Sequence, residues 1–127
     1  GVPGLDTMVP AVLDLAAKAS ISYGDVVRVL CERPAEIFGV SDRKGFLKPG
    51  ADGDVVLVDP EIERKIEGRD IISKAGRSPF EGYPLRGKVV ASFLRGDVIS
   101  ENAKLKSNIP TGKFVSRGNI QWKRSDA

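Results

Sequence analysis

The hydrophobic pattern of the chain changes from helical to strand-like near Gly39, and this change restricts the fold more than any other feature. One apolar face repeats at helical spacing over residues 5–16, and a second follows Ser22. Beyond Gly39 the apolar runs are β-branched and extended, as in segments 54–59 and 88–94. Helices followed by strands predict two structural layers, or the junction between two domains.

The first helix has a defined start because it contains a proline. Pro10 is tolerated only in the first turn, where its missing N–H has no helical partner. Asp6 or Thr7 is therefore the expected N-cap, and the apolar spacing carries the helix to about Lys18.

Capping and helix-breaking residues also divide the next helical segment. Ser22 and Asp25 have the spacing of a capping box, so a second helix begins after Ser22. Pro34 is expected to stop that helix and to open a third over residues 34–38. Gly39 then ends the third helix in a left-handed cap.

The second half of the chain reads as short strands. Segment 54–59 is a strand that Pro60 is expected to close, and residues 63–67 alternate weakly enough for an edge strand. Segment 88–94 is a strand that leads into a tight turn over residues 95–97. Residues 100–127 have little pattern and are expected to lie extended along a surface.

Composition excludes several classes of protein. With 41% hydrophobic and 29% charged residues, the 127-residue chain is ordinary for a folded soluble domain. It has no apolar run of membrane-spanning length and no secretory signal, which predicts neither a membrane nor an exported location. Its single cysteine, Cys31, fits the reducing cytoplasm and is expected in the core. A net charge of +3 without a recognition motif does not favour nucleic-acid binding.

The chain contains no histidine, so it cannot supply a histidine-based acid, base or metal site. It begins at Gly1 with a loop-like segment and no methionine, which indicates a piece of something longer. Asp52, Asp54 and Asp59 flank a strand and are expected to hold turns rather than a metal. Phe80 and Tyr83 are expected to pack, although they could line an interface between domains.

Four segments together resemble the end of the amidohydrolase superfamily, most closely the dihydroorotases. They are the loop GVPGLDT at 1–7, the helix RPAEIFG at 33–39, the strand pair GFLKPGADGDVVL at 45–57, and the closing elements within 78–99. The sequence departs from the family pattern at position 6, where Asp replaces the more frequent Glu, and at Gly53, which replaces Ala.

The resemblance implies an α/β fold that is incomplete by itself. Residues 1–40 would be the last helices of a (β/α)8 barrel, residues 41–100 the returning strands of a small composite β-sandwich, and residues 101–127 a basic extended tail. A barrel takes roughly 250 residues, so this chain cannot contain one. The helix faces are therefore expected to look toward absent protein, either the rest of the parent chain or a second copy, rather than toward the strands.

The resemblance also implies a metal-dependent hydrolase that interconverts N-carbamoyl-aspartate and dihydroorotate in pyrimidine synthesis. Zinc and its ligands would lie upstream, so no catalytic residue and no metal ligand is assigned here. Gly1 is assigned to substrate binding, because the family's backbone at this loop closes over the substrate and a glycine allows close approach. Asp6 is expected to act as an N-cap rather than as a catalytic acid.

Two alternatives stay open at this point. An allantoinase or dihydropyrimidinase parent is one, because GKFVSR at residues 112–117 resembles the tail of the latter. A non-catalytic, dihydroorotase-like assembly module is the other, and it would be a natural product of about this length.

Overall fold

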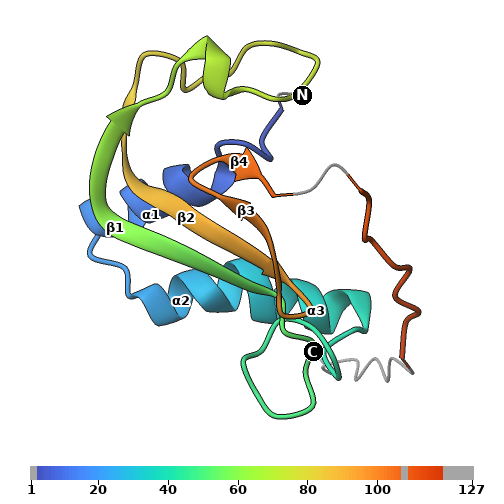
Figure 1. The fold of residues 1–127 in the computed structure, drawn as a ribbon. Coiled ribbons are helices and arrows are strands. Elements are labelled where there is room, and N and C mark those ends of the chain that lie inside the picture. Colours follow the sequence, from blue (N-terminus) through green and yellow to red (C-terminus); the bar gives the residue numbers. More distant parts are fainter. Residues whose placement is uncertain (1–2, 107–108, 119–127) are drawn as a thin grey trace.

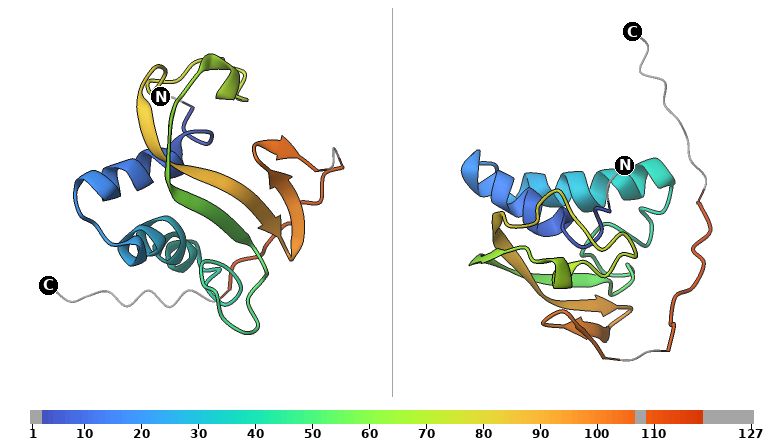
Figure 2. Two further views of the ribbon diagram at one scale, coloured as in Figure 1. Left: turned by 60° about the vertical axis from the view of Figure 1, so that its left-hand side comes forward. Right: turned by 90° about the horizontal axis from the view of Figure 1, so that it is seen from above.

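The computed structural model describes residues 3–106 and 109–118. Three α-helices lie against one face of a four-stranded antiparallel sheet whose strand order is β1-β2-β3-β4 (Figure 1). The view from above shows the helical layer on one side and the sheet on the other (Figure 2). The elements are α1 (Met8–Lys18), α2 (Tyr23–Val27), a π-helical turn (Arg28–Glu32), α3 (Arg33–Phe38), β1 (Val55–Lys65), a 3₁₀ turn (Gly68–Asp70), β2 (Pro84–Leu94), β3 (Asp97–Glu101) and β4 (Lys104–Leu105).

Helix α1 packs on the sheet, which corrects one expectation. Its start follows the prediction, with Thr7 in the N-cap position. The apolar face, however, does not look away from the strands. Leu13 and Ala16 are buried together with Val26, and a Cβ added to Gly87 of β2 would lie 2.8 Å from Leu13. The glycine lets helix and strand approach closely, so the face finds its cover within the chain.

The second and third predicted helices form one continuous helix. The Ser22 Oγ accepts a hydrogen bond from the Asp25 N–H at 3.2 Å, as the capping pattern predicts. Pro34 does not stop the helix, contrary to expectation. The preceding turn is π-helical, and the Arg33 N–H bonds to the Arg28 carbonyl, five residues back. This wider turn accommodates the proline ring, which in a regular α-helix would clash with the carbonyl four residues earlier. Gly39, with φ of 68°, ends α3 as predicted.

Strand β1 passes through Pro60 instead of ending there. The register to β2 shifts between Asp59 and Glu63, so Pro60 lies where no ladder pair forms and its missing N–H costs no strand hydrogen bond. The predicted edge strand beyond residue 63 is the continuation of β1, which is the first strand of the sheet. One bulged strand thus takes the place of the two strands that were predicted.

The Arg95-Gly96 turn joins β2 to β3 as predicted. Both turn residues have positive φ, 51° and 89°, which suits a two-residue hairpin. Residues 100–105 were expected to lie along a surface, but they form the end of β3 and the short strand β4, which pairs with β3. Residues 109–118 then run along the outside toward the end of α3, where the Gly118 N–H donates to the Gly39 carbonyl at 2.7 Å (Figure 1).

The buried core is small and much apolar surface stays open. Among the described residues, most buried hydrophobic side chains belong to two clusters, one between α1 and α2 and one formed by Ile66, Ile71 and Leu85. Cys31, expected in the core, is exposed, because the π-helical turn that carries it has no buried residue. Large helical side chains are also exposed, among them Leu15, Val29, Ile37 and Phe38.

Candidate functional site

The segment that the resemblance ties to substrate leads into α1, and the structure joins it to a distant loop. Asp6 lies two residues before α1, and its Oδ2 accepts a hydrogen bond from the Ser73 N–H at 3.3 Å. These residues are 67 positions apart in the chain. In Figure 1 the N-terminal segment and the loop between β1 and β2 lie at the same end of the molecule. Gly1 itself lies outside the described residues.

The loop between β1 and β2 is closed at its base. The Ile66 N–H donates to the Tyr83 carbonyl at 3.1 Å, and the Gly82 N–H donates back to the Ile66 carbonyl at 2.8 Å. Ile66 is 1% exposed and is buried with Ile71 and Leu85. Two neighbouring hydrophobic side chains pack against this cluster, Ala11 of α1 and Phe80 of the loop. The loop and α1 therefore share one apolar cluster.

The N-terminus of α1 is not capped by a side chain. Thr7 occupies the N-cap position, but its side chain makes no capping hydrogen bond, and its buried Oγ1 has no partner. Asp6 is not the N-cap, and its carboxylate instead accepts the hydrogen bond from the Ser73 N–H. Its negative charge still lies near the positive end of the helix dipole, which is a favourable position. Sequence reasoning missed the contact with Ser73, because no local pattern signals a bond across such a separation.

The packing predicted for Phe80 is confirmed, whereas Tyr83 is 61% exposed. Tyr83 instead contributes its backbone carbonyl to the base of the loop.

Asp52 and Asp54 hold a turn, as expected, at the opposite end of the sheet. The Lys44 Nζ lies 2.7 Å from an Asp52 oxygen and also bonds to Asp54. The hydrogen bond from Lys44, followed by that from Arg43, lowers the pKa of Asp52. Burial acts most strongly on Asp54 and would raise its pKa, but hydrogen bonds from Lys44 and the Arg95 N–H together lower it. Both carboxylates are thus ionised partners of one ammonium group, which is a structural role.

Asp59 holds the bulge of β1. Its Oδ1 accepts a hydrogen bond from the Glu61 N–H at 2.9 Å, two residues along the chain. This short-range bond lies where the register to β2 shifts. Asp59 was expected to flank a strand and hold a turn, but it lies within β1 and holds a bulge.

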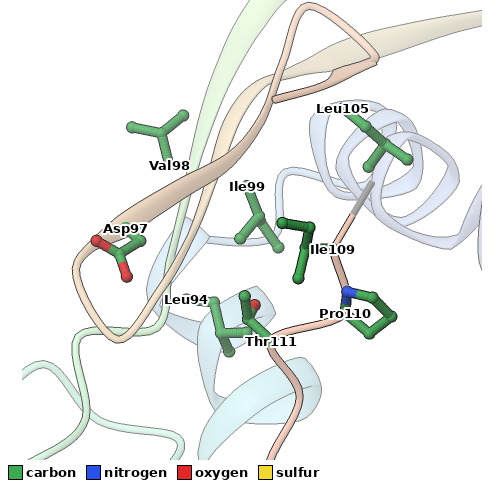
Figure 3. A pocket seen from close by; sticks show the side chains of 8 residues that line it. All are labelled: Leu94, Asp97, Val98, Ile99, Leu105, Ile109, Pro110 and Thr111. Atoms are coloured by element: carbon green, nitrogen blue, oxygen red, sulfur yellow. The ribbon is translucent and has the colours of Figure 1, made fainter. Parts of the chain in front are cut away.

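A pocket of about 410 Å³ lies between the β2–β3 hairpin and the chain after β4 (Figure 3). Its lining is mostly apolar, and Asp97 is its one charged residue. The lining comprises Leu94, Asp97, Val98, Ile99, Leu105, Ile109, Pro110 and Thr111. Such a surface offers hydrophobic contact but no constellation of acid, base and nucleophile.

The described residues do not form a metal centre. Over residues 3–106 and 109–118, no group of three or more His, Cys, Asp or Glu side chains could hold an ion. Asp52 and Asp54, which share one lysine, are already bonded to its ammonium group, that of Lys44. The donor set therefore does not fit a zinc ion, and no reaction step through a metal follows from it. In the same part of the chain, no helix is long and apolar enough to cross a membrane.

Comparison with known proteins identifies the family. The model of the amidohydrolase family matches residues 5–99, which include α1 to α3, β1, β2 and the first three residues of β3. The chain belongs to the amidohydrolase family. The resemblance seen in the sequence is thereby confirmed at the level of the superfamily.

The relatives of this amidohydrolase chain include both hydantoinases and dihydroorotases. It is 34% identical over 122 residues to the L-hydantoinase of Paenarthrobacter aurescens, covering 95% of the chain and 27% of that enzyme. It is 36% identical over 118 residues to the dihydroorotase of Pyrococcus furiosus, covering 93% of the chain and 28% of the enzyme. Dihydroorotases and hydantoinases are thus about equally similar to it.

Solved structures agree on the fold. The L-hydantoinase (dihydropyrimidinase) from Arthrobacter aurescens superposes with a TM-score of 0.80 and 34% identity, over 84% of this chain and 24% of that one. A D-hydantoinase superposes with a TM-score of 0.76 and 29% identity, over 89% and 25%. The amidohydrolase chain thus spans about a quarter of the length of the proteins it matches.

Proposed function

We propose that this chain is the C-terminal part of a dihydroorotase, an enzyme that adds water across the ring amide of dihydroorotate to give N-carbamoyl-aspartate, and that also closes the ring. The observation that carries the proposal is the family match over residues 5–99, together with 36% identity to a dihydroorotase over nearly the whole chain. The four motifs that resemble dihydroorotases lie within this aligned region or beside it.

Within that proposal, the catalytic groups and the zinc site belong to the remainder of the parent protein. The chain has no histidine, and Asp52, Asp54 and Asp59 are engaged in structural ion pairs or backbone hydrogen bonds. The role of this chain in the parent enzyme would be structural. Residues 1–40 would complete the barrel, residues 41–100 the β-sandwich, and residues 101–127 a basic tail. Gly1 would bring backbone close to the substrate.

The open apolar surface supports a partner in the parent. Val29, Ile37 and Phe38 are 61%, 56% and 68% exposed on the long helix. Covering such side chains is worth on the order of 1.5–3 kcal/mol each. The proposed cover is the rest of the parent chain, with a second copy of this chain as the other possibility. The relatives are about four times as long, which supports the first.

A hydantoinase or dihydropyrimidinase parent is the second candidate, and one observation favours it. The L-hydantoinase structure superposes with a TM-score of 0.80 over 84% of the chain. Both candidate reactions hydrolyse a cyclic amide and differ in the group attached to the ring, since dihydroorotate carries a carboxylate. Substrate preference therefore separates the two.

The test uses the longest natural protein that contains this chain, purified with its metal and assayed on dihydroorotate, hydantoin, dihydrouracil and allantoin. We expect kcat/KM to be highest for dihydroorotate, and the 127-residue chain alone to be inactive. Preference for hydantoin or dihydrouracil would replace the first proposal with the second. No hydrolysis of any of the four, together with an intact mass near 13.7 kDa for the natural product, would favour a non-catalytic module.

A further inference from the structure

The segment 109–118, which we call the strap, lies across one end of the molecule. In Figure 1 it runs from the β4 side of the sheet to the end of α3. The guanidinium group of Arg95, in the β2–β3 turn, donates a hydrogen bond to the Thr111 carbonyl. The Gly118 N–H donates to the Gly39 carbonyl at 2.7 Å. The strap is thus fastened at one point to the sheet and at another to the helical layer.

The strap buries very little of its own surface. Its residues are all exposed except Val115, which is half-buried, and Phe114 is 93% exposed. No strap residue belongs to either hydrophobic cluster. Within the described part of the chain, residues 112–117 make no hydrogen bond or ion pair. A segment with so few buried contacts and backbone bonds opens at a much lower free energy than the whole fold.

Arg95 belongs to a part of the fold that does not depend on the strap. Its N–H donates to the Asp54 carboxylate at 2.9 Å, and the N–H of the following Gly96 donates to the Gly53 carbonyl at 2.9 Å. Arg95 is itself half-buried, although it lies in a turn. The guanidinium group is therefore presented to Thr111 by a turn with its own bonds, whereas the strap that it binds has no regular secondary structure.

The strap forms one wall of the apolar pocket in Figure 3. Residues 109–111 line the pocket from the strap, and Leu94 and Ile99 line it from the hairpin. Both hairpin side chains belong to half-buried residues. The hydrogen bond from Arg95 is made at Thr111, within this wall. When the strap leaves, the pocket loses the wall and the apolar side chains of the hairpin become more exposed.

We propose that the strap opens and closes as a unit over this pocket, without unfolding of the helices or the sheet, and that Arg95 is the latch that holds it closed. The closed strap covers apolar side chains beside β4, the edge strand of the sheet. Uncovered apolar surface at a sheet edge favours association with other chains, and covering it with a loop prevents this. The inference goes beyond the proposed function and does not depend on which reaction the parent catalyses.

The experiment measures hydrogen exchange of the Gly118 amide in the longest natural protein that contains this chain. Arg95→Ala removes the latch, and Arg95→Lys keeps a charged donor. Arg86→Ala is the matched control, because Arg86 is also half-buried and pairs with Glu61, not with the strap. We expect Gly118 exchange to accelerate about tenfold in Arg95→Ala, since one hydrogen bond to a charged group is lost. The acceleration should be smaller in Arg95→Lys and absent in Arg86→Ala.

Three further readouts separate a latch from general loosening. The Gly96 amide reports on the turn and should exchange at its wild-type rate in Arg95→Ala. In the wild type, Gly118 exchange should be nearly independent of urea at low concentration, because opening the strap exposes little surface. Alkylation of the thiol in an Ile99→Cys variant, read from its own peptide by mass, should accelerate when Arg95→Ala is added, in step with Gly118 exchange.

Each readout also has a result that would overturn the inference. Equal Gly118 exchange in the wild type and in Arg95→Ala would show that Arg95 is not a latch. Faster exchange of Gly96 together with Gly118 would show that the substitution disturbs the turn instead. If urea accelerated Gly118 exchange as steeply as that of the β2 amides, the strap would open only with the whole fold. An unchanged alkylation rate in the Ile99→Cys variant would show that the strap does not cover the pocket.

Discussion

Replacing Gly87 by alanine should destabilise the protein by about 2–5 kcal/mol. The new Cβ would lie 2.8 Å from both Cβ and Cδ1 of Leu13, where α1 crosses β2. Overpacking of this kind costs roughly 1–3 kcal/mol. Gly87 also has φ of 106°, and forcing a residue with a Cβ to positive φ costs about 1–2 kcal/mol more.

A matched control separates the two costs. Gly50 has φ of 88° with nothing within 4 Å of an added Cβ, so Gly50→Ala should carry only the backbone cost, about 1–2 kcal/mol. Urea titration followed by circular dichroism gives both free energies of unfolding. The difference between the variants measures the contact between α1 and β2. If Gly87→Ala costs no more than Gly50→Ala, the close packing of this helix on this strand is refuted.

Three further predictions concern charge and metal. The hydrogen bond from Lys18 lowers the pKa of Asp14 below its ordinary 3.8. The stability that the ionised Asp14 contributes is therefore complete above about pH 4 and is lost as pH falls through the lower folded-state pKa. Asp14→Asn should accordingly flatten the stability profile, measured by urea titration, below about pH 4. Bonds to Asp52 and then Asp54 raise the pKa of Lys44 above 10.5, so Lys44→Met should cost about 1–2 kcal/mol at neutral pH. That cost should vanish as pH rises through the raised pKa, and a pH-independent cost would contradict the ion-pair account. Finally, the 127-residue chain should retain no stoichiometric zinc after exhaustive dialysis, because it offers no histidine and one cysteine; one zinc per chain by metal analysis would disprove this.

Local chemistry in the sequence predicted the local structure well. Ser22 caps its helix through the expected amide, Gly39 takes the left-handed conformation that ends α3, and Arg95-Gly96 forms the hairpin turn. Each of these depends on residues within a few positions of one another. Such signals survive folding because the bonds they describe are made inside one turn.

The failures arose where distant partners decide the outcome. Pro34 and Pro60 were expected to break their elements, yet a π turn and a register shift, both invisible to periodicity, absorb them. Cys31 was expected inside from its residue type alone, but it is exposed, whereas its neighbour Leu30 packs against the core. The Asp6–Ser73 bond joins residues 67 positions apart. Only the family resemblance, which reflects a whole tertiary structure, gave information about how segments distant in the sequence are arranged.

The π-helical turn also resets the phase of the long helix. At about 100° per residue, the nine positions from Val26 to Ala35 would place their side chains about 180° apart in a straight α-helix. Both side chains are nonetheless buried, Val26 against α1 and Ala35 where the chain at Gly45, between α3 and β1, passes close to the helix. A π turn acts as one inserted residue, which takes back about 100° and brings the two to about 80°. Deleting one residue from 28–32 would leave eight positions between the two buried side chains, which at about 100° each again places them about 80° apart. We therefore expect the shortened stretch to become a regular α-helix with both ends still in contact, so the π turn is a place where the fold accommodates one extra residue.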